Sequence, residues 1–280
     1  MSEYDKIENF AVIDLGNTNT KIAFNFQNHS TFKKIVIRTS QDYNKQINAI
    51  CSILKKNKTS RAILAIAAPI DFESNQLINP PNLRGYKNKK PQADFKKTGI
   101  EIQILNDLEL AAIGEATYGA GKKYQVVAIV SMATGAGGAL VKNREIVRGR
   151  YNFEAGQHIF ESNAPVIPYK ITGSFEAALS GSALRKITHQ DPAKLPDSFY
   201  HQQIDRLSQI LTNFSVFWSP EVIILTGPIA KRFQRSLPLI KKKLKKYIQI
   251  IPIPKVLLSS MGEDAALAGG YALMKKYERK

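Results

Sequence analysis

Hydrophobic residues in the first part of the chain form short apolar runs separated by polar turns. Residues 10–26, FAVIDLGNTNTKIAFNF, consist of an apolar run, a turn of Gly, Asn and Thr, and a segment in which apolar and polar residues alternate. This order predicts a strand, a tight turn and a second strand, as in a β-hairpin. Residues 43–56 have helical spacing, and the short apolar run over residues 62–70, which contains Pro69, predicts a buried strand.

Strands that end in polar or glycine-rich turns recur further along the chain. Residues 79–90, NPPNLRGYKNKK, predict a loop, and residues 100–105 predict a short strand. Apolar residues at helical spacing follow over residues 108–118, which places Asn106 and Asp107 between a strand and a helix. Two more apolar runs, residues 126–131 and 222–225, lead directly into ATGAGG and TGPIA. Strands that alternate with helices predict an α/β fold with functional turns at the strand ends.

The composition fits an ordinary globular protein. With 280 residues, of which 44% are hydrophobic and 22% charged, we expect two lobes or one large α/β unit. Cys51 is the only cysteine, which excludes an internal disulfide and a multi-cysteine zinc site and favours a cytoplasmic location. The N-terminal residues MSEYDKIENF lack the basic start and apolar stretch of a signal peptide, and no apolar run approaches the roughly 20 residues that span a bilayer. We therefore expect neither secretion by that route nor a membrane span.

The formal net charge of +17 is compatible with nucleic acid, an anionic membrane surface or a polyanionic small substrate. The densest basic run, residues 241–246, lies in LIKKKLKKYIQI, whose apolar residues have mixed helical spacing. This pattern favours a solvated helix face, because no recognised DNA-binding pattern accompanies it. ATP, which is strongly anionic, suits the charge equally well, and we expect neither nucleic acid nor membrane as a partner.

A first polar turn has the residues that a phosphate cradle requires. Small residues allow close backbone approach, hydroxyls and amides donate hydrogen bonds, and one cation is present; the candidates are Asp14, Gly16, Asn17, Thr18, Asn19 and Lys21. Asp14 could hold Mg²⁺ through water. The alternative is that these are simply good hairpin-turn residues.

A second turn, residues 134–138, offers a hydroxyl and bare backbone N–H groups, which also suit a polyphosphate. The candidates here are Thr134, Gly135, Gly137 and Gly138. Close packing of crossing strands would explain the glycines equally well. Neither turn has the GKS or GKT of a P-loop or the GxGxxG of a dinucleotide fold, so a different nucleotide-binding fold is indicated.

Three carboxylates lie at a strand end or beside glycines. Asp107 follows Asn106 at the strand-to-helix junction, where a helix N-cap is the simpler explanation. Glu154 and Glu176 lie beside glycines and apolar residues and could accept hydrogen bonds from sugar hydroxyls, although isolated glutamates are usually solvated. The four histidines have neither metal-ligand spacing nor an obvious serine and carboxylate partner, so we assign them no metal.

Taken in order, these segments resemble the ROK family of repressors, uncharacterised reading frames and sugar kinases, nearly from end to end. DLGNTNTK resembles the first phosphate motif, and AAPIDFESNQLINPPNLRGY resembles the Pro-rich loop with its Asn-Leu segment. NDLELAAIGEATYGAGKKY resembles the stretch with the catalytic Asp, and ATGAGGALVKNREIVRG resembles the second phosphate motif. EAGQ, GSFEAALSGSAL, VIILTGPIA and MGEDAALAGG fall where the family has its sugar-binding and adenosine-binding segments.

The resemblance implies a two-lobed actin-like ATPase fold, which is ribonuclease H-like, with sugar and ATP in a central cleft. It implies a small lobe over residues 1–105 and a larger one over residues 106–280, with the last helix packing back on the first lobe. Members of the family commonly associate into homodimers.

The resemblance also assigns roles to residues. Asp107 would be the catalytic base, and the sugar would be bound by Asn82, Asn106, Asp107, Glu154, Gln157 and Glu176. ATP, with Mg²⁺ near Asp14, would lie between the two turns, with Gly227 near the adenosine. This agrees with phosphoryl transfer by positioning, charge neutralisation and a base that orients the nucleophile.

The chain departs from the family pattern at three places. Gln157 stands where the family usually has the His of Glu-x-Gly-His, and His158 follows it. The stretch PVIPYKITGSFE has no cysteine, so we expect no structural zinc. Asn17 stands where a second glycine is common, and residues 226–228, TGP, replace a Gly-Gly pair.

The resemblance predicts a hexose 6-kinase, with glucose the first candidate. An N-acetylmannosamine or N-acetylglucosamine kinase is the nearest alternative, and a catalytically weak sugar or nucleotide sensor is another. A sugar-responsive transcriptional regulator would require an N-terminal DNA-binding extension, whereas the first phosphate motif begins almost immediately after the first residue.

Overall fold

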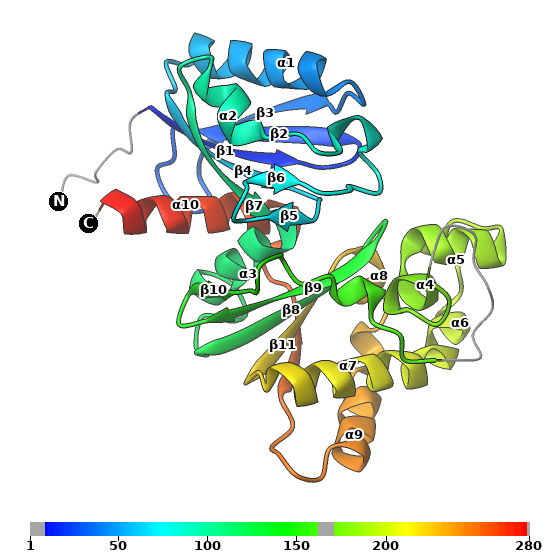
Figure 1. Ribbon diagram of the computed structural model, residues 1–280. Helices are drawn as coiled ribbons and strands as arrows, with labels where there is room; N and C mark the ends of the chain where they lie inside the picture. The colour runs from blue at the N-terminus through cyan, green and yellow to red at the C-terminus, as the bar shows by residue number, and fades with distance from the viewer. Residues whose placement is uncertain (1–8, 162–170, 279–280) are drawn as a thin grey trace. The chain divides into compact units, whose positions relative to one another are not determined.

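The computed structural model describes residues 9–161 and 171–278, which form two compact α/β units (Figure 1). The first unit contains the described residues up to Thr117, Arg148–Asn152 and the described residues from Asp264 onward. The second contains Tyr118–Val147 and the described part of Phe153–Glu263. Each unit has its own five-stranded sheet and hydrophobic core.

Two sequence-based expectations concern residues that are not described. The expectation about secretion depends mainly on residues 1–8, and half of the stretch expected to lack zinc ligands is residues 165–170. Residues 1–8 and 165–170 lie outside the described residues.

The sheet of the first unit has the strand order β3-β2-β1-β4-β7. Its strands are β3 (Lys33–Arg38), β2 (Asn19–Phe24), β1 (Phe10–Leu15), β4 (Arg61–Ile66) and β7 (Glu101–Asn106). β1 and β2 form the predicted antiparallel hairpin, while β1, β4 and β7 run parallel. The carboxyl ends of these three parallel strands therefore meet at one edge of the sheet.

Helices cover both faces of this sheet (Figure 1). On one face lie α1 (Tyr43–Lys56), at the predicted position, and α2 (Pro91–Lys96). Asp42 caps α1 by accepting a hydrogen bond from the Lys45 backbone N–H at 3.1 Å, and successive turns of α1 bury apolar side chains of one face in the core. On the other face lie α3 (Asp107–Thr117) and α10 (Ala265–Glu278), which pack closely against each other.

The apolar run over residues 62–70 is two elements rather than one strand. β4 ends at Ile66, and Pro69 separates it from the short strand β5 (Ile70–Asp71), which pairs with β6 (Gln76–Leu77). The pairing of β4 with both β1 and β7 ends at Ile66, and Pro69 has no N–H to donate to a further ladder bond. The predicted loop over residues 79–90 contains one 3₁₀ turn, η1 (Arg84–Tyr86).

The sheet of the second unit has the strand order β10-β9-β8-β11-β12. Its strands are β10 (Glu145–Val147), β9 (Ala136–Lys142), β8 (Val126–Met132), β11 (Val222–Thr226) and β12 (Lys255–Leu258). β8, β11 and β12 are parallel, and β9 is antiparallel to β8. The strands predicted before ATGAGG and TGPIA are thus confirmed as β8 and β11.

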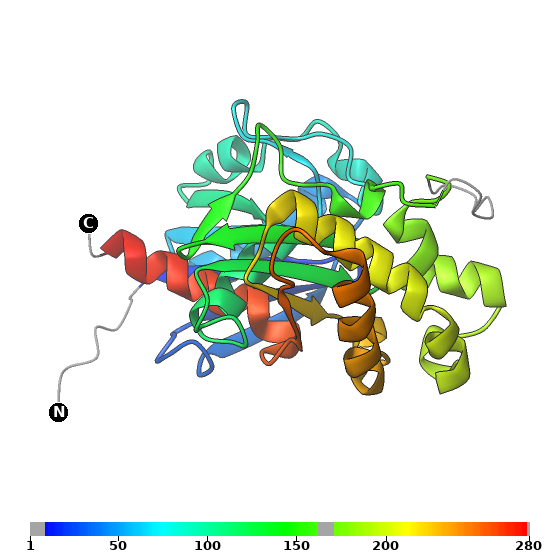
Figure 2. The same cartoon turned by 90° about the horizontal axis from the view of Figure 1, so that it is seen from below.

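The α-helices of the second unit are α4 (Phe175–Leu179), α5 (Gly181–Thr188), α6 (Asp197–Gln202), α7 (Ile204–Trp218), α8 (Pro228–Lys231) and α9 (Leu237–Tyr247). Short 3₁₀ turns are η2 (Ala155–Gln157), η3 (Pro192–Lys194), η4 (Gln234–Ser236) and η5 (Gly262–Asp264). α7 lies across the sheet with α9 beside it (Figure 2). Apolar side chains of α7 fill the core.

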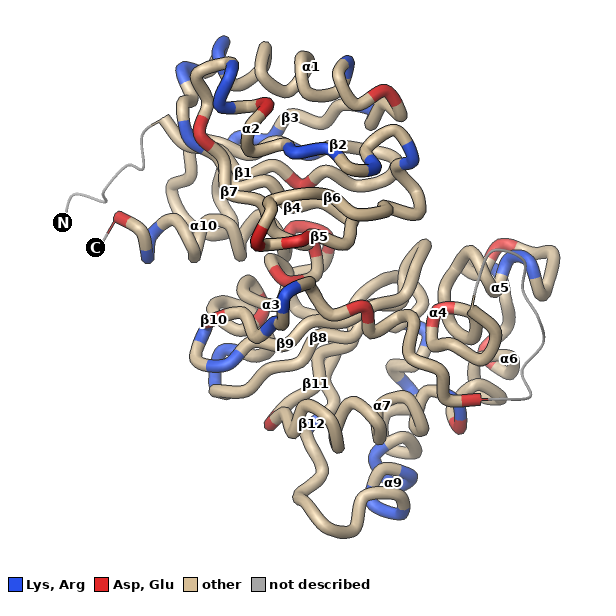
Figure 3. The backbone as a smooth tube through the Cα atoms, viewed as in Figure 1, with Lys and Arg blue, Asp and Glu red and all other residues tan. Residues whose placement is uncertain are grey.

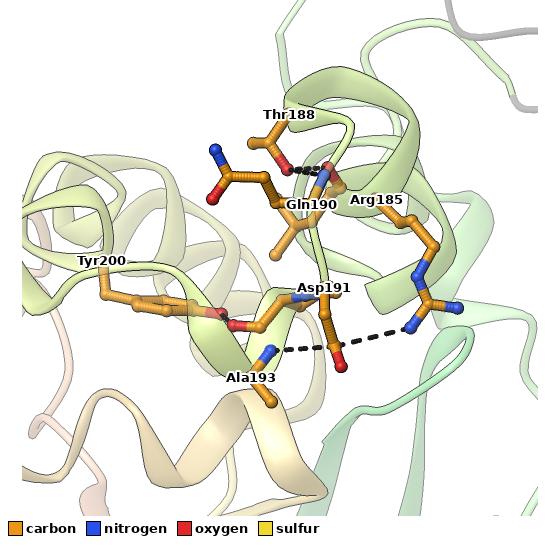
Figure 4. Close-up of polar contacts among 8 residues, drawn as sticks. Arg185, Thr188, Gln190, Asp191, Ala193 and Tyr200 are labelled. Carbon is orange, nitrogen blue, oxygen red and sulfur yellow. Dashed lines mark hydrogen bonds and ion pairs between the residues drawn. The ribbon is translucent and has the colours of Figure 1, made fainter.

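A polar cluster orders the connection between α5 and α6 (Figure 4). Asp191 accepts a hydrogen bond from the Ala193 N–H at 3.2 Å and pairs with Arg185. The Tyr200 hydroxyl, which is buried, donates to the carbonyl oxygen of Pro192 at 2.7 Å. These contacts cap η3 and fix the turn, so Asp191 has a structural role.

The lysine-rich run forms the solvated helix face that its pattern predicted. Ile240 and Leu244 of α9 are buried, whereas Lys241, Lys242 and Lys245 are exposed. Figure 3 shows the basic residues of α9 in blue. Over residues 9–161 and 171–278, the helices are all too short or too polar to cross a bilayer.

Candidate functional site

The first turn, residues 16–19, connects β1 to β2 at the carboxyl edge of the first unit's sheet. The Gly16 N–H donates to the carbonyl oxygen of Asn19 at 3.1 Å, which closes the turn. The Thr39 hydroxyl donates to the Gly16 carbonyl at 2.8 Å, and the Thr39 N–H donates to the Thr18 carbonyl at 2.9 Å. The turn is therefore held by a second loop as well as by its own hydrogen bonds.

The polar groups of this turn fit an anionic ligand with a cation. The side-chain oxygen of Asn17 is buried and finds no hydrogen-bond partner among the described residues. The O and N positions of an amide side chain are assigned from their surroundings. Asn17 therefore offers one polar atom that could either accept a hydrogen bond from a ligand or donate one to it. Asp14 and Lys21 face each other across the hairpin, with 3.9 Å between the Asp14 Oδ2 and Lys21 Nζ atoms. Carboxylate oxygens are ligands that Mg²⁺ prefers, so these residues fit both phosphate and Mg²⁺.

Asn106 and Asp107 lie at the same edge of the sheet as the first turn. In the parallel ladder, Leu15 of β1 is in register with Ile66 of β4, and Ile66 is in register with Asn106 of β7. Adjacent strands are about 4.8 Å apart, so the end of β7 is about 10 Å from the end of β1. Asp107 is partly exposed there, as the first residue of α3.

Asn106 is fixed by hydrogen bonds on both sides of its amide. Its Oδ1 accepts from the Leu108 N–H at 2.9 Å, and its Nδ2 donates to the carbonyl oxygen of Ala68 at 3.3 Å. The N-cap that the sequence suggested is therefore present, formed by Asn106. One Nδ2 hydrogen remains for another acceptor.

Glu109 is a residue of this region that the sequence analysis did not single out. Its Oε2 accepts a hydrogen bond from the Asn106 backbone N–H at 3.2 Å. Burial raises the pKa of Glu109, although Arg148 and the Asn106 N–H act in the opposite direction. The N-cap followed three residues later by Glu is a capping-box pattern, so this signal was readable in NDLE.

The loop that carries Asn82 is attached to the residues before α1. The Asn82 backbone carbonyl accepts a hydrogen bond from the Gln41 side chain at 3.1 Å, and the Tyr86 hydroxyl donates to the Ser40 carbonyl at 2.8 Å. Gly85 packs so closely on the Gln41 carbonyl that a Cβ there would overlap it. Asn82 itself is exposed.

In the second unit, the second turn contacts two of the predicted sugar-binding residues. Gly135 lies against the carboxylate of Glu176, since a Cβ on Gly135 would be 2.9 Å from Glu176 Oε1. Gly156 of η2 packs against the carbonyl of Ala136, where a Cβ would overlap it. Gln157 Nε2 donates to Glu176 Oε2 at 3.3 Å. The structure thus brings the second turn, Gln157 and Glu176 together.

Other backbone contacts fix the second turn. The N-terminal residues of α5 donate to it: the Gly181 N–H to the Ala133 carbonyl at 2.7 Å and the Ser182 N–H to the Thr134 carbonyl at 3.0 Å. Gly227 has φ +95° and lies so close to the Met132 carbonyl that a Cβ would overlap it. Only glycine combines that backbone conformation with that approach.

Glu154 and His158 flank η2 in different surroundings. Glu154 is exposed, and its carbonyl accepts from the Gln157 N–H at 2.9 Å. His158 packs among the rings of Phe160, Phe214 and Phe217, and its Nε2 is 3.1 Å from the Asn213 amide. Burial lowers the pKa of His158. His158 is therefore held in an aromatic cluster and does not take the place that Gln157 occupies beside Glu176.

The predicted residues fall into two groups, one in each unit. The first unit holds Asp14, Gly16, Asn17, Thr18, Asn19, Lys21, Asn82, Asn106 and Asp107. The second unit holds Thr134, Gly135, Gly137, Gly138, Glu154, Gln157, Glu176 and Gly227. Among residues 9–161 and 171–278, no three His, Cys, Asp or Glu side chains lie close enough together to hold a metal ion.

Each of the two α/β units has polar turns that follow its strands, which is the arrangement expected of the actin-like ATPase fold. The sequence model of the ROK family matches residues 10–277, and the chain belongs to this family. Glucokinase of Thermotoga maritima is 24% identical over 306 residues, covering 94% of this chain and 96% of that relative.

Two solved structures carry the same fold. A ROK hexokinase from Thermus thermophilus matches with a TM-score of 0.80 at 19% identity, covering 95% of this chain and 99% of that one. A ROK family glucokinase from Streptomyces griseus, in complex with glucose and AMPPNP, matches with a TM-score of 0.73 at 18% identity, with the same coverage. The predicted family and fold class are confirmed.

Proposed function

We propose that this protein is an ATP-dependent sugar kinase in which Asp107 is the catalytic base. One observation carries the proposal: Asp107 begins α3 at the edge of the sheet where the first turn also lies, and the ladder fixes both positions. A base must lie within reach of the hydroxyl whose proton it takes, and rigid elements hold such a group better than loops do. The relative named glucokinase supports the class of reaction.

In the proposed reaction, Asp107 takes the proton of a sugar hydroxyl while the hydroxyl oxygen attacks the γ-phosphorus of ATP. The new bond joins that oxygen to phosphorus, and the bond between the γ-phosphorus and the bridging oxygen breaks, so ADP leaves with the electron pair. Phosphoryl transfer of this kind depends on positioning and on neutralising charge.

The residues of the two turns would bind the nucleotide. Backbone N–H groups of the first and second turns, with Thr18 and Thr134, would donate to phosphate oxygens, and Lys21 would supply a positive charge. Gly227 would lie near the adenosine. Mg²⁺, when bound, neutralises charge on the phosphates, and Asp14 would hold it through water.

Glucose is the first candidate substrate, phosphorylated at its 6-hydroxyl. Asn82, Asn106, Glu154, Gln157 and Glu176 would bind the sugar hydroxyls together with Asp107. The Streptomyces griseus neighbour was solved with glucose, which supports a hexose. Gln157 keeps both a donor and an acceptor, so it can still orient Glu176 and bind a hydroxyl.

A substrate panel tests the proposal and ranks the alternatives. Turnover is measured in a coupled assay with ATP and Mg²⁺ against glucose, mannose, fructose, N-acetylglucosamine and N-acetylmannosamine, and the product is identified by ³¹P NMR. The proposal predicts a hexose 6-phosphate, with glucose giving the highest kcat/KM. A preference for an acetylated sugar would replace glucokinase by N-acetylhexosamine kinase.

No turnover with any sugar, together with calorimetric binding of a sugar or of ATP, would contradict the kinase proposal. It would favour the weakly catalytic sensor instead. The sensor remains the second candidate function because Gln157 replaces the usual histidine of the family pattern and Asn17 replaces a common glycine.

A further inference from the structure

Glu109 is a buried carboxylate whose charge is only partly compensated. Its side chain is 3% exposed, and its Oε1 atom finds no hydrogen-bond partner among the described residues. The nearest cation, Arg148, has its Nε 3.7 Å from Oε1, too far for a good hydrogen bond. A buried carboxylate costs free energy unless it is paired, so its presence at this position calls for a role other than packing.

The other oxygen of Glu109 acts on the residue beside the proposed base. Glu109 Oε2 accepts from the Asn106 N–H, while Asn106 Oδ1 accepts from the Leu108 N–H. These two hydrogen bonds enclose Asp107, which lies between Asn106 and Leu108 in the chain. The backbone on both sides of Asp107 is therefore fixed by a reciprocal cap.

Arg148 is itself held from two directions. Its guanidinium carbon lies 3.9 Å from the centre of the Phe72 ring, which fixes the side chain by a cation–π contact. The segment that carries it, Arg148–Asn152, is attached to β5: Asn152 Oδ1 accepts from the Ile70 N–H at 2.8 Å, and Arg150 pairs with Asp71 at 3.2 Å. A segment remote in sequence thus supports the first turn of α3.

We propose that Glu109 and Arg148 are positioning residues for the proposed phosphoryl transfer: Arg148 holds the Glu109 carboxylate against the Asn106 N–H, and this fixes Asp107 toward the sugar hydroxyl. The proposal rests on the proposed kinase function and deepens it. It predicts that loss of the Glu109 acceptor, or loss of Arg148 beside a charged Glu109, misorients Asp107 and therefore lowers kcat more than it raises KM.

The test compares Glu109→Leu, Glu109→Gln, Arg148→Met and the double variant Glu109→Gln with Arg148→Met in the full-length chain. Glutamine keeps an acceptor for the Asn106 N–H without a charge, whereas leucine removes the acceptor. Glu115→Leu is the matched control, since Glu115 is also buried and lies on the same helix, two turns beyond Asp107. Kinetics with the best sugar of the panel are measured beside hydrogen exchange at the Asn106 amide.

We expect Glu109→Leu to lower kcat by about tenfold to hundredfold with little change in KM, and to speed exchange at the Asn106 amide. Glu109→Gln keeps kcat close to the wild-type value. Arg148→Met lowers kcat when Glu109 is present but has little effect beside Glu109→Gln, because no buried charge is then left unpaired. Glu115→Leu changes neither kcat nor exchange at Asn106.

Three results would overturn the inference. An active Glu109→Leu variant with wild-type kcat would show that the cap is only structural, and unchanged exchange at Asn106 would show that it does not fix the backbone there. An equal loss in Glu115→Leu would mean that any buried glutamate of α3 has the same effect. If Glu109→Leu does not fold, Arg148→Met and the double variant carry the same comparison. A wild-type chain without turnover would instead overturn the proposed function itself.

Discussion

Among single residues, Gln157 and Glu176 are two of the expected sugar-binding residues, and they are joined by a hydrogen bond. Both side chains are partly exposed, with 3.3 Å between Nε2 and Oε2, so each can still reach a ligand. The glutamine amide holds the carboxylate in one orientation and leaves its carbonyl oxygen free to accept from a hydroxyl. Orientation of Glu176, rather than charge, is what Gln157 contributes.

We predict that Gln157→Leu weakens sugar binding. Loss of one hydrogen bond to a charged group costs about 1.5–3 kcal/mol, which corresponds to a KM about 10 to 100 times higher. Steady-state kinetics measure this, with Gln157→His as the comparison. If Gln157→Leu keeps the wild-type KM for every sugar of the panel, Gln157 does not take part in binding.

The buried pair of Glu109 and Arg148 predicts a pH-dependent effect on stability. The folded-state pKa of Glu109 is raised, so its contribution to stability is fully present below the unfolded pKa and is lost as the pH rises through the folded pKa. Arg148→Met removes a group that lowers this pKa, so the loss grows at neutral pH. We expect a lower free energy of unfolding by about 1–3 kcal/mol near pH 7.5 and a smaller difference near pH 4.5.

Urea denaturation of wild type and Arg148→Met at the two pH values measures this difference. Glu109→Gln is the control, because it removes the titrating group and should make the Arg148→Met effect independent of pH. An effect of Arg148→Met that is the same at both pH values in the presence of Glu109 would contradict the assignment.

At the scale of elements, the crossing of α3 and α10 depends on glycine. A Cβ on Gly114 would overlap the carbonyl of Ala265, and a Cβ on Gly269 would overlap the carbonyl of Leu110. The two helix backbones are therefore in direct contact, which only residues without a Cβ allow. Since α3 begins at Asp107, this contact also sets the position of the proposed base.

We predict that Gly269→Ala destabilises the first unit by about 1–3 kcal/mol, because the added methyl group forces the helices apart. Gly99→Ala is not a suitable control, since Gly99 has φ +81°. Gly149→Ala is a suitable control, because a Cβ at Gly149 would have no heavy atom within 4 Å. Thermal unfolding followed by circular dichroism should show a lower Tm for Gly269→Ala than for Gly149→Ala, and equal Tm values would contradict the close crossing.

Most elements could be predicted because they depend on local pattern. The hairpin of residues 10–26, the helix over residues 43–56 and the strands before each glycine turn were all found in the structure. The end of β4 at Ile66 was missed, since an apolar run does not reveal where ladder pairing stops. In the site, the turn residues could be identified by type, and Glu109 by its capping spacing. Arg148, the partner of Glu109, could not be predicted, and neither could the contact between the expected sugar-binding residues Gln157 and Glu176. These contacts join residues that are 39 and 19 positions apart in the chain.

In the whole molecule, the first unit consists of three stretches that are separated in the sequence. The chain leaves this unit after Thr117, returns for Arg148–Asn152, and returns again at Asp264. The short middle stretch supplies Arg148 and Asn152, and the last supplies α10, which covers the face of β1 opposite α1. The surroundings of Asp107 therefore depend on residues from both later stretches.

The proposed function depends on removal of the proton of a sugar hydroxyl by Asp107. The most direct test is the rate of phosphoryl transfer from γ-labelled ATP to the best sugar of the panel, in wild type and Asp107→Asn. Asp191→Asn is the control, since Asp191 is a carboxylate that caps η3 and lies outside the proposed site. We predict that kcat falls by a factor of about 10²–10⁴ in Asp107→Asn, with the fold and ATP binding intact, and that it is unchanged in Asp191→Asn. A rate for Asp107→Asn within a few-fold of wild type would contradict this prediction.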